Sequence, residues 1–154
     1  MFSRRGKEYV LRSRGPCVTI QTNDGHRHHM PKHICITIGH IRIAAQLNDS
    51  RTAQKVWDSL PLSANVTRWG KEIYFPVPIQ HDLERTCARD TVEKGDLAFW
   101  PEENCFCIFF GPTPISEDGE IRPASPVNVI GYINGEYGRL TEVEDLSEIK
   151  IEQY

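Results

Sequence analysis

Eight aromatic side chains between residues 69 and 110 have the bulk and the flat faces from which binding pockets are built. They are Trp69, Tyr74, Phe75, Phe99, Trp100, Phe106, Phe109 and Phe110. Aromatic side chains commonly line apolar pockets for small molecules and peptides. The alternative is that most of them fill the core, where large apolar side chains are usually found.

Alternation along residues 105–110 divides this set. On an extended strand successive side chains point to opposite faces. Phe106, Ile108 and Phe110 therefore share one face, and Cys105, Cys107 and Phe109 share the other. Only one of the two faces can fill the interior of the domain.

Glu72 adds a carboxyl group beside Trp69 and Gly70. A carboxylate at this place can hold the amine or hydroxyl group of a ligand. The alternative is an exposed strand carboxylate, since charged residues are mostly found on the surface.

We expect the thiols and imidazoles not to form a metal site. Cys105 and Cys107 are two residues apart, whereas structural zinc usually takes two Cys-x2-Cys pairs, so we interpret them as buried free thiols. The segment with His26, His28, His29 and His33 lacks acidic ligands, and such tracts capture transition metals adventitiously. With no nucleophile elbow and no phosphate-binding glycine loop, we expect neither metal nor cofactor.

Charge divides the chain into two parts. Residues 1–32 contain seven Lys or Arg and two Asp or Glu, while residues 33–154 contain eleven and nineteen. A basic arm can contact phosphates, but the acidic remainder repels a polyanion. We therefore predict that residues 1–32 are an N-terminal extension with at most one strand, near residues 17–20, that residues 33–154 are the folded domain, and that nucleic acid is not a partner.

The apolar runs are short. Stretches such as residues 97–100 contain only a few apolar residues, far fewer than a membrane helix needs. The basic N-terminal residues are not followed by a continuous apolar stretch, so we expect no secretory signal, no membrane association and a cytoplasmic protein with reduced thiols.

Periodicity predicts a mostly β domain. Apolar residues alternate over residues 33–38 and again from Ile41, with Gly39 between them, which indicates a hairpin. Residues 51–60 change to a helical period after the cap candidates Asp49 and Ser50, and the helix is expected to stop at Pro61. Further strands are expected at residues 65–69, 72–77, 96–100, 105–110, 127–133 and around 149–151. Seven or eight short strands with one or two short helices predict a closed barrel.

Three segments carry a resemblance to a known family. Residues 69–75 (WGKEIYF), 95–100 (GDLAFW) and 109–114 (FFGPTP) are similar to small prokaryotic cyclophilin-like proteins of uncharacterised function, and the similarity covers residues 33–154. This resemblance implies a closed cyclophilin-like β-barrel of about eight strands, with a cleft on the outside of the barrel.

The resemblance also implies where an isomerase site would lie. Cyclophilins hold a prolyl peptide in an apolar cleft with an arginine near the proline amide, and Arg68 is the candidate for that role. Cys105 and Cys107 stand where a glutamine and a phenylalanine of the cleft are expected. Residues 115–126 offer no match for the cleft tryptophan and histidine.

Three functional hypotheses follow. The first is a domain that binds a small molecule or peptide, without established catalysis, in a cleft near six residues: Trp69, Glu72, Tyr74, Trp100, Cys107 and Phe109. The second is a peptidyl-prolyl cis-trans isomerase that uses Arg68. The third is a structural or oligomer-forming protein with a large buried aromatic interface.

Overall fold

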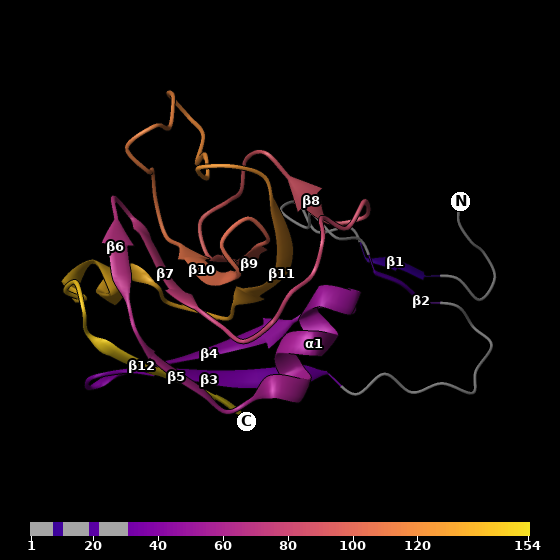
Figure 1. Cartoon of the computed structure of the whole chain (residues 1–154), viewed down its shortest axis with the longest axis horizontal. Coiled ribbons are helices and arrows are strands. Elements are labelled where there is room, and N and C mark those ends of the chain that lie inside the picture. The colour runs from indigo at the N-terminus through magenta and orange to yellow at the C-terminus, as the bar shows by residue number, and fades with distance from the viewer. Residues whose placement is uncertain (1–7, 11–18, 22–30) are drawn as a thin grey trace.

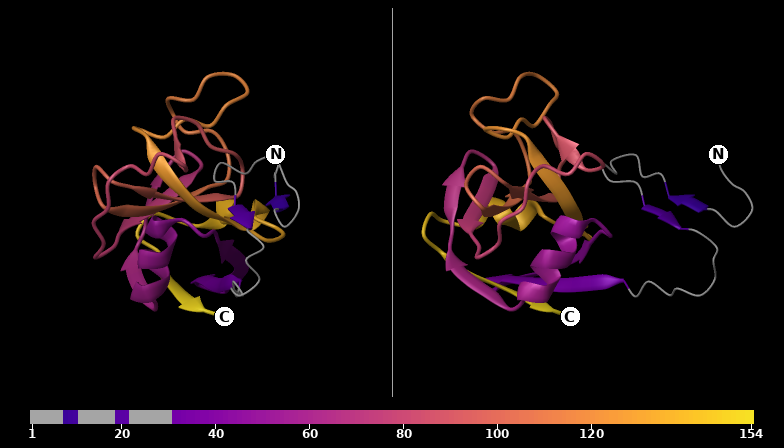
Figure 2. Two further views of the ribbon diagram at one scale, coloured as in Figure 1. Left: turned by 90° about the vertical axis from the view of Figure 1, so that its right-hand side faces the viewer. Right: turned by 45° about the vertical axis from the view of Figure 1, so that its right-hand side comes forward.

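The structure is a computed structural model that describes residues 8–10, 19–21 and 31–154 (Figure 1). Most of these residues form one ten-stranded sheet that curls round into a nearly closed barrel (Figure 2). None of the helices in the described part of the chain has the length and apolar character needed to cross a membrane.

The strand order shows how the barrel forms. Along the sheet the strands are β5 (Leu62–Asn65), β12 (Glu148–Gln153), β3 (Lys32–Ile38), β4 (Ile41–Leu47), β11 (Val127–Ile133), β9 (Asp96–Trp100), β10 (Cys105–Phe109), β7 (Glu72–Pro76) and β6 (Thr67–Trp69), and β8 (Ala88–Arg89) pairs with β11. The two edge strands, β5 and β6, are consecutive in the chain. The sheet therefore returns to its own starting point, and the prediction of a mostly β barrel with few helices is confirmed.

The predicted hairpin and helix are confirmed. β3 and β4 pair antiparallel around Gly39, whose φ of +61° is accessible to glycine at low cost. Helix α1 (Arg51–Ser59) begins at Ser50, whose Oγ accepts a hydrogen bond from the Ala53 N–H at 3.1 Å. It ends at Leu60, before Pro61. The remaining helical turn, η1 (Gly138–Glu142), is a 3-10 helix.

One predicted strand is in fact two. The pattern over residues 65–69 predicts a single strand, but the strand is interrupted at Val66, between β5 and β6. The Val66 N–H donates to the Ser147 carbonyl at 2.9 Å, and the Val66 carbonyl accepts from the Leu146 N–H at 2.7 Å. These bonds to the segment before β12 let the chain leave one edge of the sheet and enter the other.

Two apolar clusters lie on opposite faces of the sheet. The interior core takes one face of each strand and includes Ile36, Phe75, Phe106, Ile108 and Phe110, together with Ala53 and Val56 of α1. The second cluster, here called the outer cluster, consists of Val92, Ala98, Cys105, Cys107, Phe109, Ile121, Val127 and Val129, with Tyr74 and Trp100 packed against it. The division of residues 105–110 into two faces is confirmed.

A buried polar network fixes α1 to the barrel. Glu84 accepts hydrogen bonds from the Arg51 and Thr52 N–H groups, each at 3.0 Å, at the start of the helix. Asn128 of β11 donates to the Thr52 hydroxyl at 3.1 Å and accepts from the Glu84 N–H at 2.7 Å. Thr52 and Asn128 are fully buried and hydrogen-bonded, as buried polar groups must be.

Before the barrel, β1 (Glu8–Val10) and β2 (Thr19–Gln21) pair antiparallel as a separate two-stranded sheet. The sequence predicts at most one strand in this region, and two are found. Cys17 and the histidines at 26, 28 and 29 lie outside the described residues.

Candidate functional site

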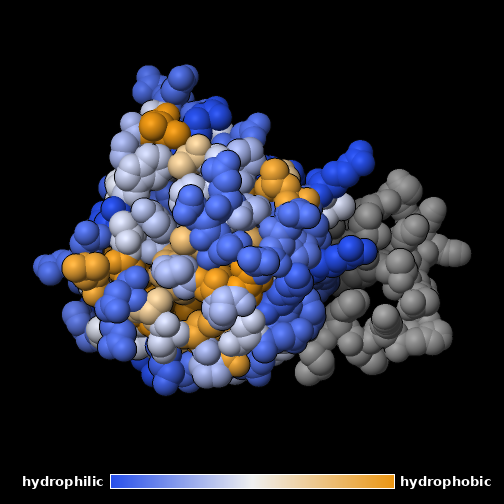
Figure 3. Space-filling model, viewed as in Figure 1, coloured by the Kyte–Doolittle hydropathy of each residue, from blue (hydrophilic) through white to orange (hydrophobic). Residues whose placement is uncertain are grey.

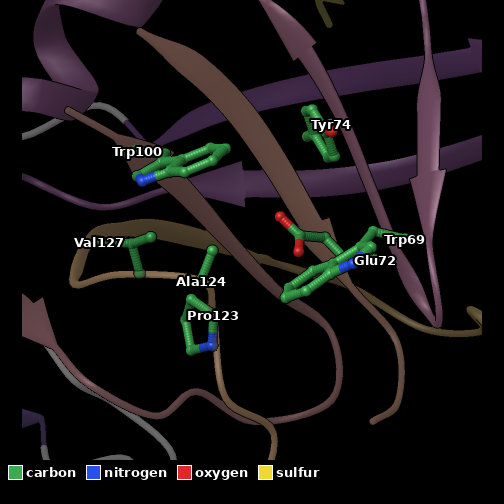
Figure 4. A pocket seen from close by; sticks show the side chains of 7 residues that line it. All are labelled: Trp69, Glu72, Tyr74, Trp100, Pro123, Ala124 and Val127. Atoms are coloured by element: carbon green, nitrogen blue, oxygen red, sulfur yellow. The ribbon is translucent and has the colours of Figure 1, made fainter. Parts of the chain in front are cut away.

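A pocket opens over the outer cluster, on the outside of the barrel. Seven residues line it: Trp69, Glu72, Tyr74, Trp100, Pro123, Ala124 and Val127. Strands β6, β7, β9 and β11 and the segment before β11 contribute these side chains, and the Glu72 carboxyl group points into the space between them (Figure 4). The cavity volume is about 100 Å³. A cavity of about 150 Å³ can hold benzene, so this one accommodates a group of a few heavy atoms.

Glu72 is the charged group of the pocket. Its side chain is 3% exposed. Burial raises the pKa of the Glu72 carboxyl group from 4.5 to about 7, and a hydrogen bond with the Cys107 thiol partly opposes this rise. Among the residues that the structure describes, no lysine, arginine or histidine forms an ion pair with Glu72. The pocket therefore holds a titratable carboxyl group that no cationic side chain of the described residues pairs with.

The aromatic wall is built by two strands that do not pair with each other. Tyr74 of β7 and Trp100 of β9 meet edge to face, with ring centroids 5.9 Å apart and an angle of 90° between the rings. The Trp100 indole N–H donates to the Ser125 hydroxyl at 2.6 Å, and Ser125 donates to the Glu102 carboxylate at 3.1 Å. Burial and the nearby Glu72 raise the pKa of Tyr74 above its ordinary value. Ser125 thus connects the wall to the segment that supplies Pro123 and Ala124.

The turn before Glu72 is positioned by close backbone packing. Gly70 has a φ of +63°, and a Cβ there would lie 2.8 Å from the Pro114 Cδ and 3.0 Å from the Pro112 carbonyl oxygen. The Lys71 N–H donates to the Pro112 carbonyl, and the Phe110 N–H donates to the Lys71 carbonyl, at 3.0 and 2.9 Å. Residues 69–72 and 110–114 therefore meet in space, and their contact fixes the direction of Trp69 and Glu72.

Comparison with known proteins shows the family of this chain. The cyclophilin-like family matches residues 32–152. This chain belongs to the cyclophilin-like family. A hypothetical protein of Archaeoglobus fulgidus, whose structure was determined in solution, is 34% identical to this chain, with a TM-score of 0.70. The similarity covers 84% of this chain and 99% of that one. No curated protein matches the sequence.

The cyclophilin-like barrel brings four of the six expected ligand-binding residues to one pocket. Trp69, Glu72, Tyr74 and Trp100 line the cavity. Cys107 and Phe109 do not line it. Both are essentially fully buried in the outer cluster beneath it, with exposed fractions of 1% and 0%. Glu72 is buried rather than an exposed strand carboxylate.

Arg68, the candidate for an isomerase arginine, lies away from this pocket in the cyclophilin-like barrel. Its Nη1 donates to the carbonyls of Thr141 and Val143 at 3.0 and 2.9 Å, and Nε and Nη2 donate to the Gly70 carbonyl at 3.2 and 3.0 Å. The guanidinium carbon lies 5.2 Å from the centroid of the Phe110 ring, which belongs to the interior core. Trp69 points to the pocket, and its neighbour Arg68 on the same strand points to the other face.

Three lining residues were missed by sequence reasoning. Pro123, Ala124 and Val127 belong to the end of a long connection and the start of β11. Small and apolar residues in a segment without periodicity carry no local signal of a pocket. The hydrogen bond between Ser125 and Trp100 and the pairing of β11 with β9 bring these residues to the aromatic wall.

The thiols of the described residues behave as core groups. Cys35, Cys87, Cys105 and Cys107 are free and buried. Burial raises the pKa of Cys105 and of Cys87 to about 11. Within residues 8–10, 19–21 and 31–154, no group of three or more His, Cys, Asp or Glu side chains is arranged to hold a metal ion.

Proposed function

We propose that this cyclophilin-like domain is a binding protein that takes a small molecule, or a side chain of a peptide, into the pocket over the outer cluster. The observation that carries the proposal is the Glu72 carboxyl group, which is buried among Trp69, Tyr74 and Trp100 (Figure 4) and has no ion-pair partner in the described part of the chain. An apolar cavity with one well-placed polar group is the usual composition of a small-molecule site.

The energetics of Glu72 support this interpretation. A carboxyl group whose pKa is raised to about 7 by burial costs stability at neutral pH. A leucine or methionine at this place would pack on the outer cluster without that cost. Strongly perturbed titratable groups in a cleft are more common at functional sites than elsewhere.

Binding is preferred to prolyl isomerisation because of the composition of the pocket. None of its seven lining residues is an arginine. The guanidinium group of Arg68 already donates to three backbone carbonyls on the other face of the strand. Isomerisation is nonetheless measured in the experiment below, because a prolyl peptide is one possible occupant.

The alternative of a structural protein has less support. On the face shown in Figure 3, hydrophobic side chains form patches that are broken up by hydrophilic residues. In the described part of the chain, only four large hydrophobic residues are exposed: Leu83, Ile115, Leu146 and Tyr154. A large apolar interface would require them to gather in one continuous area.

The three tryptophans allow a direct test with the full chain. Trp69 and Trp100 line the pocket, whereas Trp57 packs on the interior core from α1. The three indole N–H signals can be followed by two-dimensional NMR while fragments are added: alcohols, amides, amines and an Ala-Pro peptide. We expect some fragments to shift the signals of Trp69 and Trp100 while that of Trp57 remains in place.

A matched pair of variants locates the binding. Ala124 is exposed at the rim and lines the cavity, so Ala124→Phe fills the pocket from outside. Ala44 of β4 is also exposed and does not line the pocket, so the identical change Ala44→Phe serves as the control. Ala124→Phe should abolish the shifts and Ala44→Phe should keep them. No shift with any fragment overturns the proposal, and exchange cross-peaks between the isomers of the Ala-Pro peptide identify an isomerase instead.

We also propose that the protein works in the cytoplasm. Four free, buried thiols are typical of a reducing compartment, where disulfides are rare. Fractionation of cells that express the full chain tests this proposal, and recovery from an oxidising compartment contradicts it.

A further inference from the structure

We propose that the ligand of this pocket is an organic cation, held through an alkylated ammonium group by Glu72 and the surrounding aromatic rings. This inference rests on the proposed binding function and specifies the chemical class of the ligand.

The first argument is charge. Glu72 is 3% exposed and lines the cavity. The groups that act electrostatically with it are Tyr74, Cys105 and Cys107, and the pKa of each is raised, so all three are neutral at physiological pH. The site therefore has one ionisable acid and no positive charge among its described neighbours. A ligand that brings a positive charge supplies the missing partner and recovers the cost of burying the carboxylate.

The second argument is the set of aromatic rings around the carboxyl group. Three aromatic residues, Trp69, Tyr74 and Trp100, surround the carboxyl group (Figure 4). The face of an aromatic ring carries negative electrostatic potential, and tryptophan is the most effective of the three types for binding a cation. The Trp100 N–H is already bonded to Ser125, so this indole offers its apolar surface rather than a hydrogen-bond donor to the cavity. Rings around an alkylated ammonium are a known means of recognising such groups.

The third argument is size and polarity. The cavity volume is about 100 Å³, enough for an ammonium group with small alkyl substituents but too small for a nucleotide or a sugar ring with its substituents. Pro123, Ala124 and Val127 contribute apolar contacts to the opposite side. Alkyl substituents satisfy these apolar contacts, while the positive charge satisfies the carboxylate and the rings.

The decisive experiment compares two ligands of the same shape. Choline carries a trimethylammonium group, and 3,3-dimethylbutan-1-ol has the same skeleton with a neutral carbon in place of the nitrogen. Both are titrated into the full chain at pH 8, where Glu72 is ionised, while the three indole N–H signals are recorded. We expect choline to shift the signals of Trp69 and Trp100 and to bind at least about tenfold more tightly than its isostere.

Variants separate the contribution of the Glu72 charge to choline binding from that of the aromatic rings. Glu72→Gln keeps the shape of the side chain and removes its charge, so the preference for choline should fall towards the smaller part that the rings supply. Trp69→Leu should weaken choline binding more than binding of the neutral isostere. Ala44→Phe is again the control and should change neither affinity.

Each outcome decides between the two proposals. If the isostere binds as tightly as choline, or if only neutral fragments shift the pocket tryptophans, the cation inference is overturned while the binding function stands. If neither these ligands nor any fragment shifts Trp69 and Trp100, the binding function itself fails. The wild-type comparison needs no variant, so it remains decisive if Glu72→Gln does not fold.

Discussion

The carboxyl group of Glu72 and the thiol of Cys107 form a hydrogen bond beneath the pocket, across the β7–β10 pair. The two residues are diagonal neighbours, because the ladder places Phe109 opposite Glu72 and Tyr74 opposite Cys107. Burial is the largest cause of the raised pKa of Cys107, and the Glu72 carboxylate raises this pKa further. The thiol therefore stays protonated at neutral pH and is not a nucleophile.

The burial of Glu72 makes the stability of the protein depend on pH. The folded-state pKa of Glu72 is about 7 and its ordinary value is 4.5. Between these values the folded state binds more protons than the unfolded state, so wild-type stability falls as pH rises through this window. Glu72→Gln does not titrate. We expect the unfolding free energy of the variant, relative to wild type, to rise between pH 4 and pH 8, by at most about 3 kcal/mol.

Urea denaturation of both proteins from pH 4 to pH 8 measures this difference. Other titrating groups are common to the two chains and largely cancel in the comparison. A difference that stays constant over the range would show that Glu72 has an ordinary pKa in the folded state.

A second prediction concerns Cys107 itself. Its hydrogen bond is the interaction that lowers the pKa of Glu72, against the larger effect of burial. Cys107→Ala removes the donor, so the pKa of Glu72 should rise above about 7. NMR titration of the side-chain carboxyl carbons of glutamate follows this directly. Cys105→Ala is the control. Cys105 is a buried thiol that interacts electrostatically with Glu72 but is not its hydrogen-bond partner. An equal rise in both variants would contradict the role of the bond.

Local sequence pattern predicted the parts of the fold that depend on alternation and capping. The hairpin around Gly39, the helix after Ser50 and the two faces of residues 105–110 all follow from periods of two or 3.6 and from turn residues. The break at Val66 could not be predicted in this way, because it depends on hydrogen bonds to Leu146 and Ser147, about eighty residues further along the chain.

Only part of the site could be predicted, because local pattern does not show which distant segments of the chain meet. Trp69, Glu72 and Tyr74 are on one short β-hairpin, and their types already indicate a ligand contact. The burial of Glu72 and the participation of Pro123 and Ala124 depend on the segment that crosses over the outer cluster. Arg68 shows the limit most clearly, since its side chain is on the opposite face of β6 from that of Trp69.

A third prediction tests the close contact at Gly70. Gly70 and Gly39 have nearly equal φ values of +63° and +61°, but a Cβ at Gly39 would meet nothing within 4 Å, whereas one at Gly70 would lie 2.8 Å from Pro114. Gly39→Ala should therefore cost only the conformational penalty, about 1–2 kcal/mol. Gly70→Ala should cost about 1–3 kcal/mol more, because backbone must move. Chemical denaturation of both variants measures the two costs, and the Trp69 indole signal should move only in Gly70→Ala. Equal losses of stability in the two variants would show that residues 110–114 move aside without a measurable energetic cost.

The last prediction separates a structural arginine from a catalytic one. The guanidinium group of Arg68 bonds to the carbonyls of Gly70, Thr141 and Val143, so it joins the turn before Glu72 to the end of η1. Arg68→Ala leaves these carbonyls without a donor and exposes Phe110, and we expect a loss of about 1.5–3 kcal/mol in unfolding free energy. Arg68→Lys should recover only part of it, because one ammonium group cannot reproduce the planar set of donors. An isomerase arginine would behave differently: the alanine variant would keep its stability and lose exchange of the Ala-Pro peptide. Urea denaturation together with the peptide exchange spectrum of each variant distinguishes the two roles, and we expect the change to be in stability.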